Sequence, residues 1–216
     1  MESSPRIAPM ALSGAVADPE PEDRVLLDTT VRLARSVFGG AASSILLLDQ
    51  ASAELVFTAV SGQGEEFLIG RRFPSHRGLA GWVAASGEAM IVDDVTTSEL
   101  FARDVAESTG YVPRTIMVAP LLADNDVLGV LEVLDPRPRS GSGLVDLELL
   151  TAIAEQAGYS LYCLMRGRAA EATLAAERAE FERLAGLVTL LTAAPTEQRA
   201  AGVRLVESLE HLLSCL

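Results

Sequence analysis

The segment from Arg71 to Asp135 constrains the fold of this chain more than any other part of the sequence. It opens with an apolar run between Gly78 and Gly87, which predicts a short helix with a glycine at each end. A polar, irregular stretch at 93–114 follows, and two apolar runs at 115–134 around an Asp-Asn-Asp turn predict a β-hairpin. Because so long a loop in a compact domain usually serves as a lid or binding loop, this order predicts a sheet with a lid over a small-molecule pocket.

The residues before this segment show helical and then strand patterns. Apolar residues recur at helical spacing from Pro21 to Val37, and Gly39 and Gly40 end the predicted helix. Short runs rich in apolar and β-branched residues, bounded by turn residues, then predict strands. The other expected elements are strands at 43–48, 54–60, 67–73 and 89–92, a helix at 79–85 and a surface loop at 136–143.

The two ends of the chain differ from this central part. The N-terminal residues are rich in Pro, Ser and Ala and show no period, which predicts disorder. The last third is helical to about 193, where Pro195 breaks the pattern and Thr196 is the expected N-cap of a second helix at 196–214. The chain is therefore expected to divide into a tail at 1–20, a domain at 21–164 and a helical extension at 165–216.

The helical extension carries an apolar face of its own. Leucines and alanines recur at three- and four-residue spacing from Leu147 to Leu164, and leucines recur again from Leu184 to Leu191, as in a coiled-coil seam. The helix before Met165 can pack on its own sheet, but no core remains for the later part to cover. We therefore expect this face to bind a partner helix, either in a homodimer or in a different protein.

The net charge excludes some partners and leaves others open. The formal net charge is -13, and residues 41–143 hold 14 Asp and Glu against 7 Arg. An acidic domain repels both phosphate backbones and anionic membrane surfaces, so neither nucleic acid nor a membrane is an expected partner. No apolar run approaches the roughly 18 residues of a membrane span. We expect a cytoplasmic protein.

Cysteine and histidine are too few for a metal site or a disulfide framework. The chain contains two of each, and Cys163 and Cys215 have no metal-binding spacing. Two cysteines far apart also suit a reducing compartment. No metal or cofactor is expected from these residues.

The stretches GLAGWVAASGEAMIVDDV and RTIMVAPLLADNDVLGVLEVLD, in this order of elements, resemble a GAF domain. The resemblance covers about residues 22–164. It implies an α+β fold, in which an antiparallel sheet carries helices on one face and a ligand pocket on the other. It also implies a sensory module that signals through its terminal helices.

GAF domains that bind cyclic nucleotides share a spaced set of pocket residues, which can be laid on this chain without gaps. Four members of the set are kept in kind: Ser44 on the first strand, Leu79-Ala80 on the short helix, Thr109 in the lid and Glu132 on the last strand. By this resemblance, the polar anchors Ser44, Thr109 and Glu132 are candidates to contact a ligand.

Most of the residues that read the nucleotide are absent from the same set. The family's Phe-Asp pair falls on Val60-Ser61, its lid aromatic or Asn on Ala102, its Val-Asp pair on Val105-Ala106 and its second lid Thr on Pro113. A purine is usually held by an aromatic stack and a few hydrogen bonds, and both kinds of contact are lost here. The pattern therefore favours a smaller or more apolar ligand, or a closed pocket without ligand.

Three further residues near the pocket each allow two structural interpretations. Arg77 and Arg114 flank the lid and can bind an anionic ligand, or pair on the surface with Asp93, Asp94 or Glu107. Trp82 can belong to the core or to the pocket wall. The candidate ligand-binding residues are Ser44, Val60, Leu79, Ala80, Trp82, Ala102, Val105, Ala106, Thr109, Arg114 and Glu132.

Enzymatic and pigment-binding members of the family need residues that this chain lacks. GAF-type methionine sulfoxide reductases use a pocket thiolate and bilin sensors a pocket Cys, whereas both cysteines lie beyond the last strand. Haem needs an axial His, and His76 in a loop is better explained as a solvated residue. The expected function is a non-enzymatic regulatory module that dimerises through helices and relays a small-molecule or partner signal to another protein in trans. The alternative is an interaction module with a collapsed pocket.

Overall fold

The computed structural model describes residues 19–65, 67–124, 126–137 and 143–214. The chain forms two compact units, Met1–Met165 and Arg166–Leu216. The sequence predicts the corresponding boundary between residues 164 and 165. Most of the tail expected at 1–20 lies outside the described residues.

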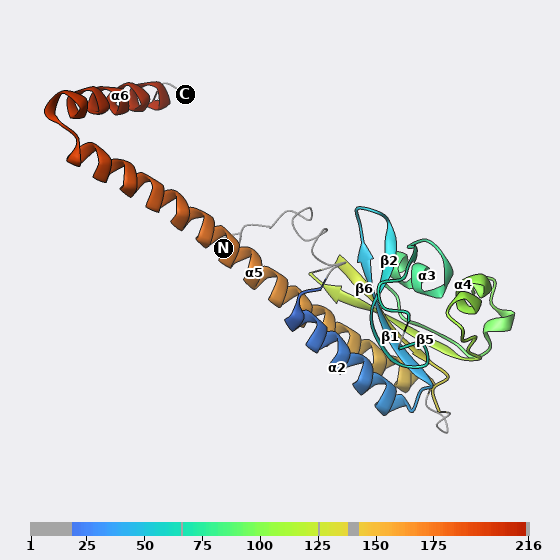
Figure 1. The fold of residues 1–216 in the computed structure, drawn as a ribbon. Coiled ribbons are helices and arrows are strands. Elements are labelled where there is room, and N and C mark those ends of the chain that lie inside the picture. Colours follow the sequence, from blue (N-terminus) through green and yellow to red (C-terminus); the bar gives the residue numbers. More distant parts are fainter. Residues whose placement is uncertain (1–18, 66, 125, 138–142, 215–216) are drawn as a thin grey trace, which may run out of the picture. The chain divides into compact units, whose positions relative to one another are not determined.

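The first unit is built on one six-stranded sheet with the order β3-β2-β1-β6-β5-β4 (Figure 1). Every neighbouring pair of strands is antiparallel. This sheet, with helices on both faces, confirms the predicted α+β fold. The strands are β1 (Ala42–Asp49), β2 (Glu54–Gly62), β3 (Arg72–Pro74), β4 (Met90–Val92), β5 (Ile116–Ala123) and β6 (Asp126–Leu134).

Two helices cover one face of the sheet, and shorter helical turns cover the other. On the first face α2 (Pro21–Phe38) and the N-terminal part of α5 (Gly143–Ala193) enclose an apolar core that reaches from Leu27 to Met165. On the second face lie α3 (Gly78–Ser86), a 3₁₀ turn (Val95–Thr97) and α4 (Arg103–Ser108). Figure 1 shows α3 and α4 on the side of the sheet away from α2.

Local signals account for both ends of α2. Pro21 occupies the first turn, where its missing N–H costs nothing, and the backbone N–H of Glu20 donates to the Asp23 carboxylate at 3.1 Å. Gly39 ends the helix in the left-handed conformation with φ 61°, and its N–H donates to the carbonyl of Arg35. The helix start and stop therefore follow from the sequence as predicted.

Helix α5 packs closely on the sheet at Gly158. A Cβ atom at this position would lie 2.7 Å from the carbonyl oxygen of Leu122, which is backbone and cannot move aside. Leu150, Ala154 and Leu161 on the same helix are fully buried. Small residues at this crossing allow the helix to approach the strands, so α5 is held firmly up to Met165.

Two sequence predictions about local elements are wrong. The strand expected at 67–73 is confined to Arg72–Pro74. The residues before it form turns, because Gly64 and Gly70 adopt positive φ angles of 87° and 85°. Thr196 is the first residue of α6 (Thr196–Ser214) rather than the residue before it.

The second unit consists of the C-terminal part of α5 and of α6. Gly202 of α6 faces Leu191 of α5 so closely that a Cβ at Gly202 would lie 2.1 Å from the leucine Cδ2. Many large apolar side chains of this unit are exposed, namely Leu174, Phe181, Leu184, Leu187, Val188, Leu190, Val203 and Val206. Within the residues that the structure describes, no helix combines the length and apolar character that a membrane crossing requires.

Candidate ligand-binding pocket

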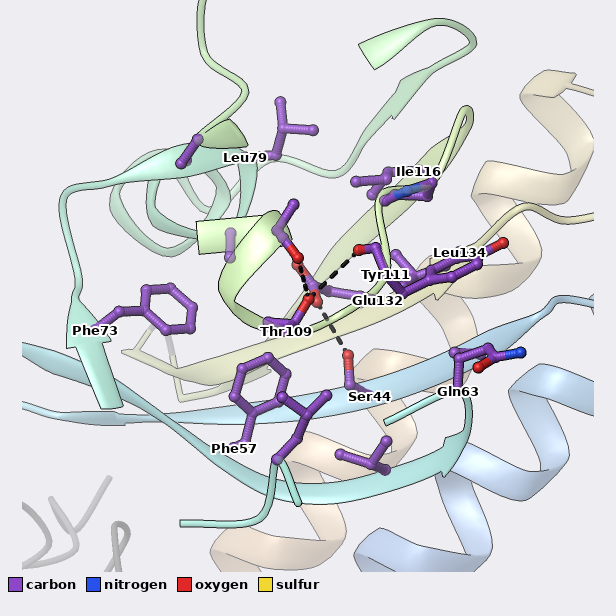
Figure 2. A pocket seen from close by; sticks show the side chains of 18 of the residues that line it. Ser44, Phe57, Gln63, Phe73, Leu79, Thr109, Tyr111, Ile116, Glu132 and Leu134 are labelled. Atoms are coloured by element: carbon purple, nitrogen blue, oxygen red, sulfur yellow. Dashed lines mark hydrogen bonds between the residues drawn. The ribbon is translucent and has the colours of Figure 1, made fainter. Parts of the chain in front are cut away.

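A cavity of about 90 Å³ lies between the second face of the sheet and the segment that covers it. Strands β1, β2, β5 and β6 contribute its floor, α3 one wall, and residues of the 93–114 lid its cover. Figure 2 shows the lining side chains converging from these elements on Glu132. The lining residues are Ala42, Ser44, Phe57, Val60, Gln63, Leu68, Phe73, Arg77, Gly78, Leu79, Ala80, Phe101, Ala102, Ala106, Thr109, Tyr111, Pro113, Ile116, Glu132 and Leu134.

The floor of the cavity carries one carboxyl group. Ser44 on β1 and Glu132 on β6 are register partners, so their side chains point to the same face of the sheet. The Ser44 hydroxyl donates to Oε2 of Glu132 at 3.0 Å (Figure 2). Protein encloses the Glu132 side chain except toward the cavity, and this desolvation raises the pKa of its carboxyl to about 7, while the Ser44 hydrogen bond lowers it in part. Near neutral pH, Glu132 is therefore divided between its charged and neutral forms.

Aromatic and aliphatic side chains surround this carboxyl group. Phe57 on β2 and Phe73 on β3 pack as a tilted pair with ring centroids 5.8 Å apart. In Figure 2 this pair lies on one side of Glu132, and Ile116 and Leu134 lie on the other. The cavity thus combines apolar walls with one ionisable group, as small-molecule sites commonly do.

The end of the lid is tied to the end of β6 through Asp135. The Tyr111 hydroxyl donates to Oδ2 of Asp135, and the backbone N–H groups of Arg114 and Thr115 donate to Oδ1 at 2.8 and 2.9 Å. The hydrogen bond to Asp135 raises the pKa of Tyr111 to about 12. Tyr111 therefore stays protonated at neutral pH and lines the cavity as a neutral group.

Hydrogen bonds and an ion pair hold the rest of the lid in place. The Thr109 hydroxyl donates to the carbonyl of Ala106 at 2.6 Å and closes the end of α4. Arg77, just before α3, pairs with Asp104 of α4 at 3.0 Å, and both side chains are exposed to solvent in part. Exposed ion pairs contribute little to folding stability, so the main effect of the Arg77–Asp104 pair is to position the rim of the cavity.

Eight of the eleven candidate residues line the cavity: Ser44, Val60, Leu79, Ala80, Ala102, Ala106, Thr109 and Glu132. Trp82 of α3 does not, because it packs half-buried against the core on this face of the sheet. Arg114 does not either, since its backbone holds Asp135 and its charge lies near Asp94. The side chain of Val105 lies outside what the structure describes.

Sequence reasoning missed the aromatic lining. Strand alternation counted from Val60 places Phe57 on the opposite face, but the pairing of β1 with β2 shifts register between Ile45 and Leu46. The shift brings Phe57 opposite Leu46 and onto the cavity face together with Val60. A bulge of this kind has no clear sequence signal. Phe73, Phe101 and Tyr111 lie in short or irregular segments, where no period predicts direction.

Comparison with known protein families identifies the family to which this chain belongs. The sequence pattern of the GAF domain matches residues 24–161. The chain belongs to the GAF domain family. Members of this family are small-molecule-binding sensory or regulatory modules. All six strands and all residues that line the cavity lie within the matched residues.

Two curated relatives are cyclic phosphodiesterases. The chain is 29% identical over 102 residues to a probable 3',5'-cyclic phosphodiesterase, pde-5, of Caenorhabditis elegans, which is 43% of this chain and 14% of the relative. It is 37% identical over 59 residues to the cone cGMP-specific 3',5'-cyclic phosphodiesterase subunit alpha' of Mus musculus, which is 27% of this chain and 7% of the relative. The chain thus spans a small part of either protein's length.

Solved GAF structures share the fold at low sequence identity. The GAF domain of a phosphoenolpyruvate-protein phosphotransferase from Coxiella burnetii superposes with a TM-score of 0.60 at 16% identity, over 71% of this chain and 90% of that one. The second GAF domain of DevS from Mycobacterium smegmatis gives 0.55 at 19%, over 68% and 97%. Free methionine-R-sulfoxide reductase from Neisseria meningitidis, solved with its substrate, gives 0.51 at 26%, over 68% and 83%.

Proposed function

We propose that this GAF protein is a non-enzymatic regulatory module that binds a small molecule in the cavity over Glu132. It dimerises through its terminal helices and relays the bound state to a protein partner in trans. The observation that carries the proposal is the cavity itself, which has apolar walls, one carboxyl on its floor and a lid tied down by Asp135.

The chemistry of the lining supports binding rather than catalysis. The ionisable side chains among the lining residues are Glu132, Arg77 and Tyr111. Tyr111 is engaged by Asp135 and Arg77 by Asp104. The Ser44 hydroxyl donates to Glu132, but no other described residue donates to that carboxyl group to complete a triad with Ser44. The GAF region at 24–161 contains no cysteine, which leaves the reductase chemistry of the Neisseria protein without a thiolate.

Exposed apolar side chains support dimerisation through helices. In the first unit, a shallow apolar groove between α2 and α5 is lined by Leu26, Leu33 and Ile153, among others. In the second unit, Phe181, Leu184 and Leu187 are more than half exposed in a single chain. Apolar helix faces of this kind usually mark an interface, and a second copy supplies the same faces by symmetry.

The connection between α5 and the sheet supports a relay. Gly158 and Leu161 of α5 pack on the strands that carry the cavity floor on their other face. A ligand that shifts β5 or β6 therefore acts on the packing of α5, whose residues continue into the second unit. A relay of this kind requires two arrangements of α5 with different ligand affinities.

Cyclic nucleotides are the second candidate ligand, because the curated relatives are cyclic phosphodiesterases. The lining supports them less well. The carboxylate of Glu132 on the cavity floor repels a phosphodiester anion, and the cationic lining side chain is Arg77 at the rim, which pairs with Asp104. Adding cAMP or cGMP and measuring the melting temperature tests this candidate directly, since a specific ligand raises it.

Native mass spectrometry of protein purified from its own host tests ligand binding. We expect added mass on the wild type and none on Ala102→Phe, which fills the cavity. The matched control is Ala85→Phe on the exposed side of α3, which keeps the added mass. If each of the three proteins shows only its own polypeptide mass, with no ligand, the result supports the interaction module with a collapsed pocket instead.

Analytical ultracentrifugation tests the dimer. We expect the wild type to sediment as a dimer and Leu184→Glu to sediment as a monomer, because a buried charge opposes the interface. Ala175→Glu introduces the same charge at another exposed position of the helix and is expected to leave the dimer intact. A monomeric wild type at all concentrations overturns this part of the proposal.

A further inference from the structure

The carboxyl of Glu132 is only partly satisfied by the protein. Oε2 accepts the hydrogen bond from Ser44, and no described residue donates to Oε1. Among the described residues, every enclosed side-chain nitrogen or oxygen has a hydrogen-bond partner, so Oε1 is open to the cavity rather than sealed in the core. A ligand in the cavity therefore meets a carboxylate oxygen with free acceptor capacity.

No side chain of the described cavity lining neutralises this carboxylate. The lining holds one cationic side chain, that of Arg77, which is partly exposed at the rim and pairs with Asp104. The remaining polar lining groups, including Ser44, Thr109 and Gln63, are neutral. A desolvated carboxylate without a counter-ion is costly, and a cation delivered by the ligand removes that cost.

The walls of the cavity also favour a positively charged ligand. Phe57, Phe73 and Phe101 all line the cavity, and the faces of aromatic rings attract cations. The net charge of -13 favours the approach of cations to the protein over that of anions. The cavity holds about 90 Å³ and is partly open at its rim, so a compact ligand with one small ring can reach from the floor toward the opening.

We infer that the cavity takes a small, mainly apolar ligand with one protonated amine, whose ammonium group binds Oε1 of Glu132 and whose apolar part packs among Phe57, Phe73 and Phe101. This inference rests on the proposed function, because it names the ligand class of the same cavity. The ammonium group donates to the carboxylate, and the Ser44 hydroxyl keeps the other oxygen in place. Glu132 selects the ligand by charge, and the phenylalanines select it by shape.

Three probes of nearly equal size and different charge test the ligand class on the full chain. They are benzylamine, benzyl alcohol and benzoate, each titrated into the wild type and followed by calorimetry and by NMR of the cavity residues. We expect benzylamine to bind at least about tenfold more tightly than benzyl alcohol, and benzoate to bind most weakly, because a charge-assisted hydrogen bond in a desolvated site exceeds a neutral one.

A pair of variants assigns the preference to Glu132. We expect Glu132→Gln to weaken benzylamine at least about tenfold and to change benzyl alcohol much less, since only the charge is lost. Glu88→Gln removes one exposed carboxylate from the loop after α3 and is expected to change neither affinity. The comparison among probes on the wild type does not depend on the stability of either variant.

The outcomes separate the inference from the function on which it rests. If benzyl alcohol or benzoate binds the wild-type cavity as tightly as benzylamine, the amine class is wrong while the ligand-binding function stands. The same holds if Glu132→Gln leaves benzylamine unchanged. If none of the three probes perturbs the cavity residues at millimolar concentration, the amine class is overturned, and the native mass spectra of the host-purified protein decide ligand binding separately.

Discussion

Ser44 and Glu132 face each other across β1 and β6, and the Ser44 hydroxyl donates to Oε2 of Glu132 at 3.0 Å. The two residues lie 88 positions apart in the sequence, and the antiparallel pairing of the strands brings them together on the cavity floor. The pair sets the charge of the pocket, because it holds a carboxyl group in a desolvated place with one hydrogen bond for support.

The raised pKa of Glu132 predicts a loss of stability as pH rises. The folded pKa is raised from 4.5 to about 7, so the folded state binds the proton more tightly than the unfolded state. Stability falls between these two values, and the cost above the upper one is on the order of 3 kcal/mol. We expect the melting temperature of Glu132→Gln, measured relative to that of the wild type, to increase from pH 5 to pH 8.

The matched variant for this measurement is Glu88→Gln, which changes the charge by the same amount at an exposed position. Its melting temperature is expected to follow that of the wild type across the same pH range. A constant difference between wild type and Glu132→Gln would show that Glu132 titrates alike in both states.

Ser44→Ala is expected to raise the pKa of Glu132 further. The Ser44 hydroxyl favours the charged form by donating to it, so its removal leaves desolvation unopposed. The carboxyl carbon chemical shift of Glu132, followed by NMR against pH, measures the effect. Ser43→Ala is the control, because the Ser43 hydroxyl donates to the backbone carbonyl of Glu132 at 2.8 Å and leaves the carboxyl alone. Equal shifts in both variants contradict the assignment.

Tyr111→Phe is expected to loosen the lid. The variant removes the hydrogen bond to Asp135 and keeps the ring, while the N–H groups of Arg114 and Thr115 still bind Asp135. We expect hydrogen exchange to accelerate in the lid at 103–115 and the free energy of unfolding to fall by about 1–2 kcal/mol. Tyr159→Phe makes the same change on an exposed ring of α5. Faster lid exchange in that variant as well would point to a general effect.

Gly158→Ala is expected to separate α5 from the sheet. The added Cβ would meet the Leu122 carbonyl oxygen at 2.7 Å, so the helix must shift, at a cost of about 1–3 kcal/mol. Gly167→Ala lies on the same helix with nothing within 4 Å and is expected to be neutral or to stabilise by up to about 1 kcal/mol. Thermal or urea unfolding compares the two, and equal effects would mean that the close crossing at Gly158 is not tight in solution.

Local patterns in the sequence predicted most of the first unit. The helix from Pro21, the hairpin of β5 and β6 and the short helix between Gly78 and Gly87 each carry start, stop or periodic signals. Family spacing placed eight lining residues, among them Ser44 and Glu132, at the cavity. The helix and hairpin signals involve only a few neighbouring residues, and the family spacing follows from the shared fold. Both can therefore be recognised in a single sequence.

The tertiary structure alone decided the character of the pocket. The shift of register between β1 and β2 turned Phe57 into the cavity, and the irregular lid placed Tyr111 against Asp135. The state of Glu132 was likewise invisible in the sequence, because a pKa depends on what surrounds a carboxyl group and not on its neighbours in the chain. The sequence by itself determined the family, the order of elements and the position of the lid between Arg71 and Asp135. Packing across the sheet determined which side chains line the cavity, and so which charge it accepts.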